Sequence, residues 1–219
     1  MMLNTDTHRY IMFQILKDIF QSDIWKYLAF KGGTACYFLH SLDRFSTDLD
    51  FDLLEERDID VILIHILEKY WKVKKWNKLI LSYGDNETNI KVDISRNIWK
   101  YNSYEVVNFY GTSIKVQDRA TIFSNKLVAL TERNTNRDIY DVYFMFQNIF
   151  PLNEDVIQER TWASSKELFS LIQEKIQKLP THYKILDWLW ELLNEKQKSF
   201  VKTKLINELI AILDMKIHF

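Results

Sequence analysis

The 219-residue sequence predicts an α+β protein in which a mixed β-sheet flanked by helices is followed by a helical bundle. Between residues 26 and 116, strand patterns recur and are interrupted by single helical segments, which favours an α+β sheet over a doubly wound one. From Asp118 onward the apolar spacing is helical to the end. We therefore expect an α/β core with an N-terminal helix over residues 1–117 and a helical domain over residues 118–219.

The first half opens with an amphipathic helix over residues 6–22, because Met12, Leu16 and Ile19 recur at helical spacing. A short strand over residues 26–31 should then lead into Gly32 and Gly33. The elements expected after the glycines are a helix over 34–42, a strand over 48–54, a helix over 58–71, and strands over 79–83, 89–95 and 104–116, the last with a turn at Gly111.

The second half reads as helices throughout. Asp118 is a favourable N-cap residue for a helix that carries Lys126 and Leu127. A second helix over residues 137–150 should end at Pro151, because proline lacks the amide hydrogen and clashes with the preceding turn. About three further helices, broken near Asn153 and Pro180, are expected in the remainder.

The charge balance gives no global sign of a nucleic-acid-binding protein, since the formal net charge is −1 and the sequence pI is about 6.5. One local run differs, because lysines are interleaved with aromatic residues between Lys69 and Lys78. Two interpretations of this basic aromatic run stay open. It is either a solvated helix end with an edge strand, or a surface that contacts a phosphate backbone and stacks bases on its rings.

Other features concern the environment of the protein. The single cysteine, Cys36, cannot form an internal disulfide and is expected to be a small buried residue in a protein from a reducing compartment. The sequence shows no apolar segment near the roughly 18 residues of a membrane span and no signal peptide, which predicts a cytoplasmic location. The five histidines lack the spacing of zinc ligands, so structural or surface roles are expected for them.

Three aspartates alternate with apolar residues in the segment DLDFDL at residues 48–53. In a strand, this spacing would place Asp48, Asp50 and Asp52 on one face. A half-buried strand with a polar outer face would give the same pattern. However, like charges on one strand face repel, and aspartate is a poor strand former. A divalent cation would compensate, because Mg²⁺ prefers carboxylate oxygens and keeps positions open for phosphate.

Two neighbouring features favour the metal interpretation. Gly32, Gly33 and Thr34 stand between an expected strand and an expected helix, where backbone N–H groups can hold a phosphate. A simple tight turn is the alternative. Asp93 lies in the middle of the apolar segment NIKVDIS and is either a strand-edge residue or the third carboxylate of a metal site.

The segment KGGTACYFLHSLDRFSTDLDFDL, residues 31–53, resembles the signature of the AbiEii/AbiGii-type nucleotidyltransferase toxins, within the DNA polymerase β-like nucleotidyltransferase superfamily. That signature is roughly GGTAL followed by R-x-S-x-D-h-D-F. The later segment NKLVALTERNTNRDIYDVYF is similar to the K-x-x-A-L-x-x-R…R-D-x-x-D segment of the family, with Lys126, Arg133, Arg137, Asp138 and Asp141. Cys36 stands where the family usually has leucine.

The resemblance implies a polymerase β-like nucleotidyltransferase fold and a role for each matching residue. The nucleoside triphosphate (NTP) would be held by Gly32, Gly33 and Thr34, with Arg44, Ser46, Lys126 and Asp138 as further nucleotide-binding residues. Mg²⁺, or alternatively Mn²⁺, would be bound by Asp48, Asp50 and Asp93. The catalytic residues would be Asp48, Asp50, Lys126 and Asp141, whereas the family pattern does not require Asp52.

Ordinary structural roles stay open for several of these residues. Lys126 could be a surface lysine on an amphipathic helix. Asp138 and Asp141 are three residues apart on one side of a helical turn, and they could cap the helix and pair with a nearby arginine. Arg44 and Ser46 could anchor the turn before the strand.

The resemblance further implies an enzyme that transfers a nucleoside monophosphate from an NTP to an acceptor, with an RNA such as tRNA as the acceptor. It would act as the toxin of a toxin–antitoxin pair, with a cognate antitoxin as its partner. The alternative is a non-catalytic nucleotide-binding module or an antitoxin-side partner, against which the intact alternating aspartates argue. A metal-dependent nuclease is a third option, which the Gly-Gly-Thr segment fits less well.

Overall fold

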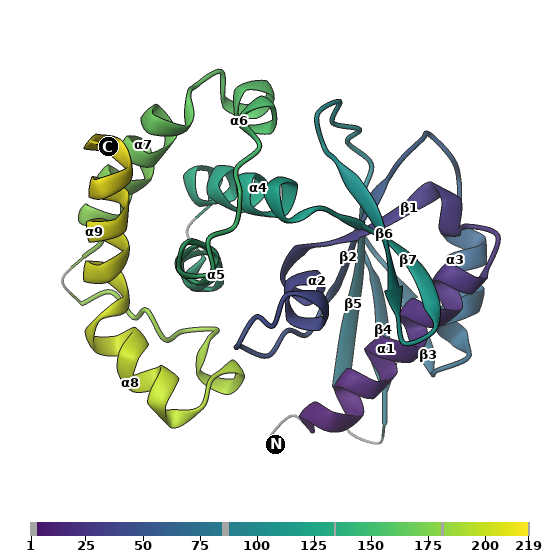
Figure 1. The fold of residues 1–219 in the computed structure, drawn as a ribbon. Coiled ribbons are helices and arrows are strands. Elements are labelled where there is room, and N and C mark those ends of the chain that lie inside the picture. The colour runs from purple at the N-terminus through teal and green to yellow at the C-terminus, as the bar shows by residue number, and fades with distance from the viewer. Residues whose placement is uncertain (1–3, 85–87, 134, 181, 219) are drawn as a thin grey trace. The chain divides into compact units, whose positions relative to one another are not determined.

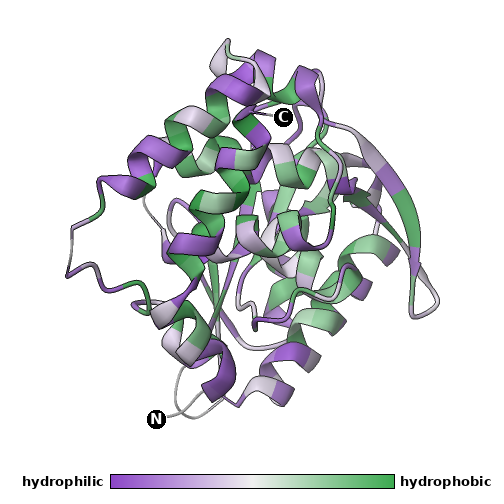
Figure 2. Ribbon diagram, turned by 60° about the vertical axis from the view of Figure 1, so that its left-hand side comes forward, coloured by the Kyte–Doolittle hydropathy of each residue, from purple (hydrophilic) through white to green (hydrophobic). Residues whose placement is uncertain are grey.

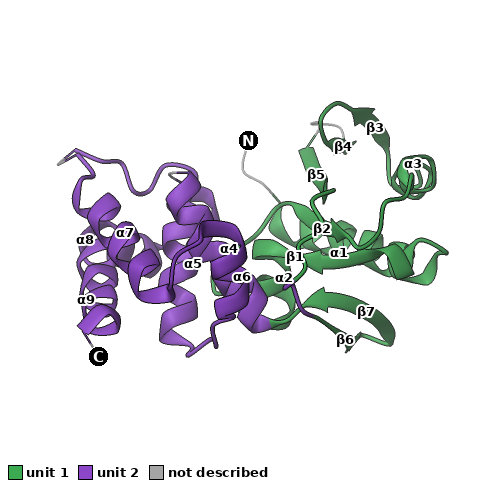
Figure 3. Cartoon of the chain, turned by 90° about the horizontal axis from the view of Figure 1, so that it is seen from above, with its two compact units in different colours: residues 1–100, 104–118 green, residues 101–103, 119–219 purple. Residues whose placement is uncertain are grey.

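The computed structural model describes residues 4–84, 88–133, 135–180 and 182–218, and the chain divides into two compact units (Figures 1 and 3). The first unit comprises residues 1–100 and 104–118, and the second comprises residues 101–103 and 119–219. The first unit combines a sheet with helices, whereas the second is built from helices. This architecture confirms the predicted α+β class.

The sheet of the first unit has seven strands among the described residues, in the order β3-β4-β5-β2-β1-β7-β6. The strands are β1 (Leu28–Lys31), β2 (Leu49–Leu53), β3 (Lys72–Lys75), β4 (Leu79–Tyr83), β5 (Thr88–Ser95), β6 (Tyr104–Phe109) and β7 (Thr112–Gln117). Strands β1 and β7 pair in parallel, as do β2 and β5, and the other neighbours pair antiparallel. The sheet is therefore mixed, as expected.

Within the described part of this unit, three α-helices accompany the sheet, α1 (Thr5–Gln21), α2 (Gly32–Leu39) and α3 (Asp60–Glu68). Helix α1 begins after Asn4, whose side chain accepts a 3.1 Å hydrogen bond from the amide of Thr7. The Phe20 ring contacts the Phe51 ring of β2 with 6.3 Å between centroids, so the apolar side of α1 packs on the sheet. Burying each such side chain contributes about 1.5–3 kcal/mol. Figure 2 shows hydrophobic and hydrophilic residues interspersed along the helices.

Several predicted boundaries near the glycines and aspartates are wrong. The strand expected over 26–31 starts only at Leu28, because residues 25–27 form a 3₁₀ turn. Helix α2 begins at Gly32, so both glycines belong to its first turn rather than preceding it. Strand β2 begins at Leu49, which leaves Asp48 in the irregular segment before the strand.

The other elements of the first unit differ less from expectation. The helix expected over 58–71 is shorter and is followed by β3, which lies at the edge of the sheet, as one interpretation of the basic aromatic run predicted. The segment 104–116 is a hairpin of β6 and β7, and Gly111 lies in its turn with φ +84°. Cys36 is fully buried, as predicted.

The second unit contains α4 (Arg119–Glu132), α5 (Asn136–Gln147), α6 (Glu154–Thr161), α7 (Ser165–Gln177), α8 (Glu195–Thr203) and α9 (Leu205–His218). Four of these helices follow Pro151, where about three were expected. Two of the breaks between these helices were not predicted, at residues 162–164 and at Lys204, where neither proline nor glycine signals them in the sequence. None of the described helices has both the length and the apolar character that crossing a membrane requires.

Candidate active site

The turn between β1 and α2 lies against the second aspartate of the DLDFDL segment. Lys31, the last residue of β1, is opposite Asp50 in the antiparallel pairing of β1 with β2. Gly32 follows with φ +79°, and a Cβ atom built on it would come within 2.8 Å of Asp50 Oδ2. Any other residue would be strained by this φ and would collide with the carboxylate. Glycine is therefore needed at position 32 for two independent reasons.

Side chains fix the segment that presents Asp48. The hydroxyl of Thr34 donates a hydrogen bond to the backbone carbonyl of Asp48 and is 2.8 Å from Ser46 Oγ. The guanidinium of Arg44, which is 2% exposed, donates to the carbonyl of Phe45 at 2.9 Å. These contacts are of the kind that the structural alternative describes, and a nucleotide-binding role for Arg44 and Ser46 stays a prediction.

Asp93 lies beside Asp50, since the parallel pairing of β2 with β5 sets these two residues opposite each other. The ammonium of Lys78 forms an ion pair with Asp93 Oδ2. Among the described residues, no group of three or more His, Cys, Asp or Glu side chains is arranged to hold a metal ion. The predicted set of Asp48, Asp50 and Asp93 is therefore not assembled as a three-ligand site.

The pair of Asp48 and Asp50 nevertheless fits a hard divalent cation. Both residues supply carboxylate oxygens, and both side chains are only partly buried. The missing Cβ of Gly32 leaves space beside Asp50 Oδ2. A hard cation bound by one or two carboxylates takes its remaining ligands from phosphate oxygens and water, which is the usual arrangement for Mg²⁺ in nucleotide sites.

The third aspartate of the segment, Asp52, has a different environment. It is 1% exposed, and its carboxylate accepts hydrogen bonds from Lys31 Nζ at 2.5 Å, Gln117 Nε2 at 2.5 Å and the Tyr104 hydroxyl at 3.0 Å. A buried carboxylate is tolerated when its charge is paired and its lone pairs are satisfied. Asp52 therefore holds the ammonium of Lys31 next to the Gly-Gly turn.

The second unit contains a buried ionic cluster between α4 and α5. Lys126 Nζ lies 2.7 Å from Asp138 Oδ1 and 2.7 Å from Asp141 Oδ2, and the two carboxylates are 2% and 0% exposed. The side chain of Lys126 is 13% exposed, so its interpretation as a surface lysine is wrong. Arg133 Nε reaches Asp138 Oδ2 at 2.8 Å, and the Thr135 hydroxyl donates to the same oxygen.

The cluster controls the ionisation of Asp138. Burial alone would raise the pKa of its carboxyl group, but the Lys126 ammonium, the Thr135 hydroxyl and the Arg133 guanidinium outweigh burial. They hold the pKa of Asp138 well below its usual range. The pairing with Arg133 is one of the structural contacts predicted for Asp138. The N-cap of α5 is Thr135, whose side chain accepts from the amide of Asp138, the third residue of the helix.

The predicted residues thus fall into two groups, each within one unit. Gly32, Gly33, Thr34, Arg44, Ser46, Asp48, Asp50 and Asp93 are in the first unit, whereas Lys126, Arg133, Arg137, Asp138 and Asp141 are in the second. Sequence reasoning missed the residues that support them, namely His8, Lys31, Tyr83, Tyr104 and Gln117. No local pattern marks these residues, because their partners are distant in the sequence.

Several solved structures share the fold of this chain, and some of them are described as nucleotidyltransferases or nucleotidyltransferase-like proteins. JHP933 from Helicobacter pylori matches with a TM-score of 0.59 and 19% identity, covering 100% of this chain and 97% of that one. The nucleotidyltransferase toxin MenT4 from Mycobacterium tuberculosis matches with a TM-score of 0.61 and 16% identity, covering 96% and 84%. A nucleotidyltransferase-like protein from Paracoccidioides brasiliensis matches with a TM-score of 0.54 and 14% identity, covering 81% and 93%. These likenesses confirm the predicted fold.

No match was found among curated protein sequences. A family model described as "Nucleotidyl transferase AbiEii toxin, Type IV TA system" matches residues 14–210. The matched region contains both groups of motif residues, so the resemblance drawn from the signature is confirmed. Because the model spans most of the chain, the protein belongs to the AbiEii family of nucleotidyltransferase toxins of type IV toxin–antitoxin systems.

Proposed function

We propose that the enzyme uses Asp48 and Asp50 to hold Mg²⁺ and transfers a nucleoside monophosphate from an NTP to an RNA such as tRNA. Mn²⁺ is the alternative cation. The reaction would take place in the cytoplasm, where both substrates occur, and a cognate antitoxin would oppose it. The approach of Gly32 to Asp50 carries this proposal, because it brings the phosphate-binding helix start against a metal-binding carboxylate.

The chain's residues would divide the work of the transfer. The backbone N–H groups at the start of α2, at Gly33 and Thr34, would hold the triphosphate. The family resemblance implies a nucleotide-binding role for Lys126, whose ammonium is held within the second unit by the carboxylates of Asp138 and Asp141. A bound divalent cation supplies charge neutralisation at the triphosphate and activation of the attacking hydroxyl. The acceptor oxygen bonds to the α-phosphorus, pyrophosphate leaves with the α–β bridging oxygen, and the hydroxyl proton passes to solvent.

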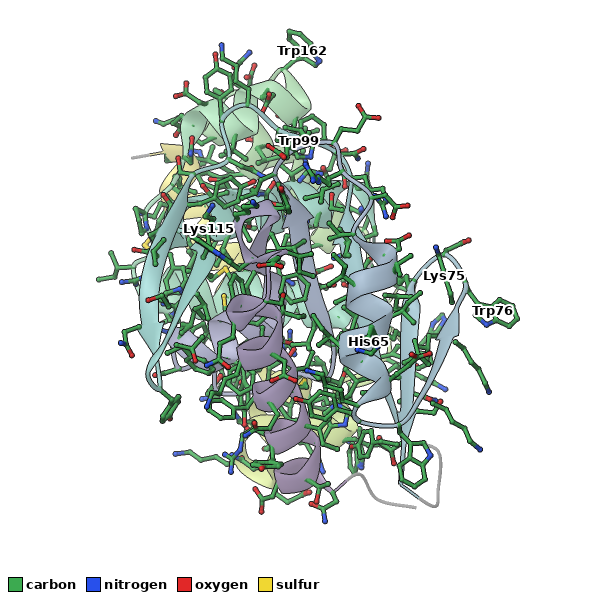
Figure 4. All side chains as sticks on the ribbon, turned by 90° about the vertical axis from the view of Figure 1, so that its right-hand side faces the viewer. His65, Lys75, Trp76, Trp99, Lys115 and Trp162 are labelled. Atoms are coloured by element: carbon green, nitrogen blue, oxygen red, sulfur yellow. The ribbon has the colours of Figure 1, made fainter. Side chains whose placement is uncertain are left out.

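The hairpin of β3 and β4 supports an RNA acceptor. A cavity of about 230 Å³ at this hairpin is lined by Lys75, Trp76, Lys78 and Arg96, together with Asp60, whose carboxylate pairs with both Lys75 and Arg96. Trp76 is 77% exposed, and Figure 4 shows Lys75 and Trp76 projecting from the sheet. An exposed ring beside several cations can stack a base and contact the neighbouring phosphates.

The test is transfer of label from α-³²P-labelled NTPs to total RNA or purified tRNA in the presence of Mg²⁺. We expect labelled RNA with the wild type and none with Asp48→Ala or Asp50→Ala, and both variants should lose the ability to arrest growth on expression. Asp23→Asn, which changes an exposed aspartate, is the matched control and should behave like the wild type.

Wild-type protein that labels neither RNA nor protein with any of the four NTPs would overturn the proposal. If NTP raised the Tm of this protein without product formation, the non-catalytic nucleotide-binding alternative would be supported instead.

A further inference from the structure

Asp48 lies outside the hydrogen-bonded ladder of the sheet. Strand β2 begins at Leu49, and Asp48 closes the irregular segment of residues 41–48. Ladder bonds fix the backbone of a strand residue from both sides, so the backbone at Asp48 depends on other partners. Two buried side chains supply them. His8 binds the carbonyl of Thr47, and Thr34 binds the carbonyl of Asp48 itself.

The hydrogen bonds of His8 define which of its nitrogens carries the proton. His8 is 1% exposed, with Nε2 2.9 Å from the Thr47 carbonyl oxygen and Nδ1 2.7 Å from the Tyr83 hydroxyl. A carbonyl only accepts, so Nε2 carries the hydrogen, and Nδ1 therefore accepts from the Tyr83 hydroxyl.

The surroundings of His8 and Tyr83 keep the imidazole neutral and the phenol protonated. Burial lowers the pKa of His8, although the Thr47 bond and the charge of Asp48 oppose this effect. Burial also raises the pKa of Tyr83 to about 12, so its hydroxyl keeps the proton that it donates. The neutral imidazole of His8 thus satisfies both partners at pH 7.

Ring packing holds the imidazole in place. The ring of His8 meets the Phe45 ring edge-on at 5.8 Å between centroids and the Tyr83 ring at 5.6 Å. His8 therefore connects α1 and β4 to the segment that leads into Asp48. An apolar side chain of similar size would keep the packing but leave the Thr47 carbonyl without its buried donor.

We propose that His8 is a positioning residue for Asp48: its Nε2–H bond to the Thr47 carbonyl, together with the Thr34 bond to the Asp48 carbonyl, directs the Asp48 carboxylate toward the bound cation. This role rests on the proposed function, in which Asp48 holds that cation. Support of a ligand by a neighbouring hydrogen bond typically changes metal affinity by about 10–100-fold.

The test compares His8→Leu and His8→Gln with a control, Met12→Ala. Met12 shares the buried face of α1 and is 0% exposed, so the control loosens the same helix without touching residues 45–48. Mn²⁺ binding is measured by isothermal titration calorimetry without nucleotide, and the Tm of each variant is recorded. His8→Leu should weaken Mn²⁺ binding by about tenfold or more. His8→Gln, whose amide can donate to Thr47, should recover most of the affinity, and Met12→Ala should lower the Tm with wild-type Mn²⁺ affinity.

The inference is overturned if folded His8→Leu binds Mn²⁺ like the wild type, if Met12→Ala weakens binding as much, or if the wild type binds no Mn²⁺. Because the measurement needs no turnover, it separates the two proposals. A wild type that binds Mn²⁺ but transfers no nucleotide contradicts the proposed function, while the comparison of His8 variants still decides the role of His8.

Discussion

Gly32 lies so close to Asp50 that a Cβ atom at residue 32 would be 2.8 Å from Asp50 Oδ2. Gly32 also has a φ angle of +79°, in the region that favours glycine. Gly111 provides a comparison, because its φ is +84° but no atom lies within 4 Å of its ideal Cβ position. A larger residue at position 111 would therefore cause backbone strain alone, whereas one at position 32 would cause backbone strain and also occupy the space beside the Asp50 carboxylate.

Gly32→Ala should abolish nucleotide transfer, because the new methyl group displaces the Asp50 carboxylate. Gly111→Ala should lose about 1–2 kcal/mol of stability from the left-handed backbone and keep its activity. Urea denaturation and initial transfer rates measure the two effects. Wild-type activity in Gly32→Ala would show that the close approach has no functional role.

The pair of Lys31 and Asp52 should be strongly coupled. Asp52→Asn leaves the Lys31 ammonium without its counter-charge, and Lys31→Met leaves a carboxylate that is 2% exposed without its cation. We expect each single change to cost about 3 kcal/mol, with Lys31→Met costing more because Asp52 is the more deeply buried partner. The double variant should be more stable than the two single losses predict, as a double-mutant cycle in urea would show. Additive losses would contradict this pairing.

The cluster around Asp138 should make stability depend on pH in the acid range. The folded-state pKa of Asp138 is lowered, so the carboxylate stabilises the fold above the unfolded pKa of about 3.9. This contribution is lost as the pH falls from that value through the lowered folded-state pKa. At pH 7 the free energy of unfolding of the wild type should exceed that of Asp138→Asn by about 3 kcal/mol. This difference in unfolding free energy should become smaller below about pH 4. A gap that stayed constant down to pH 3 would argue against an ionised Asp138.

Trp76 should contribute to RNA binding without contributing to stability. Its side chain is 77% exposed, so Trp76→Ala should leave the Tm near the wild-type value. Loss of one stacked base typically costs about 1–3 kcal/mol, which predicts tRNA binding weaker by roughly 5-fold to 150-fold in a filter-binding assay. Trp162→Ala, which changes an 86% exposed ring of the second unit, is the matched control. If Trp76→Ala and Trp162→Ala weakened tRNA binding equally, the β3–β4 hairpin would not be part of the acceptor site.

Many residues of the candidate site could be predicted from one short segment of the sequence. Gly32, Gly33, Thr34, Asp48 and Asp50 fall within one short segment, so their order and spacing are visible without a fold. The apolar alternation around Asp93 predicted a strand, and the register of β2 with β5 then set Asp93 opposite Asp50. The family match over residues 14–210 confirms the nucleotidyltransferase assignment that these motifs suggested.

Sequence patterns were less informative wherever a boundary or a partner depended on packing. The patterns placed Asp48 inside the strand and left Lys126 as a possible surface residue, whereas the structure puts Asp48 before β2 and encloses the Lys126 ammonium between two aspartates. The helix ends at Thr161 and Thr203 were missed, because no proline or glycine marks either position in the sequence.

By itself, the sequence determined the fold class, the family and the residue types of the site, because these follow from periodicity and from motifs of closely spaced residues. Only the tertiary structure decided which side chains hold those residues in place. His8 and Thr47 are 39 positions apart, and Gln117 and Asp52 are 65 positions apart. Such pairs leave no local pattern, since strand register and helix packing bring them into hydrogen-bonding distance.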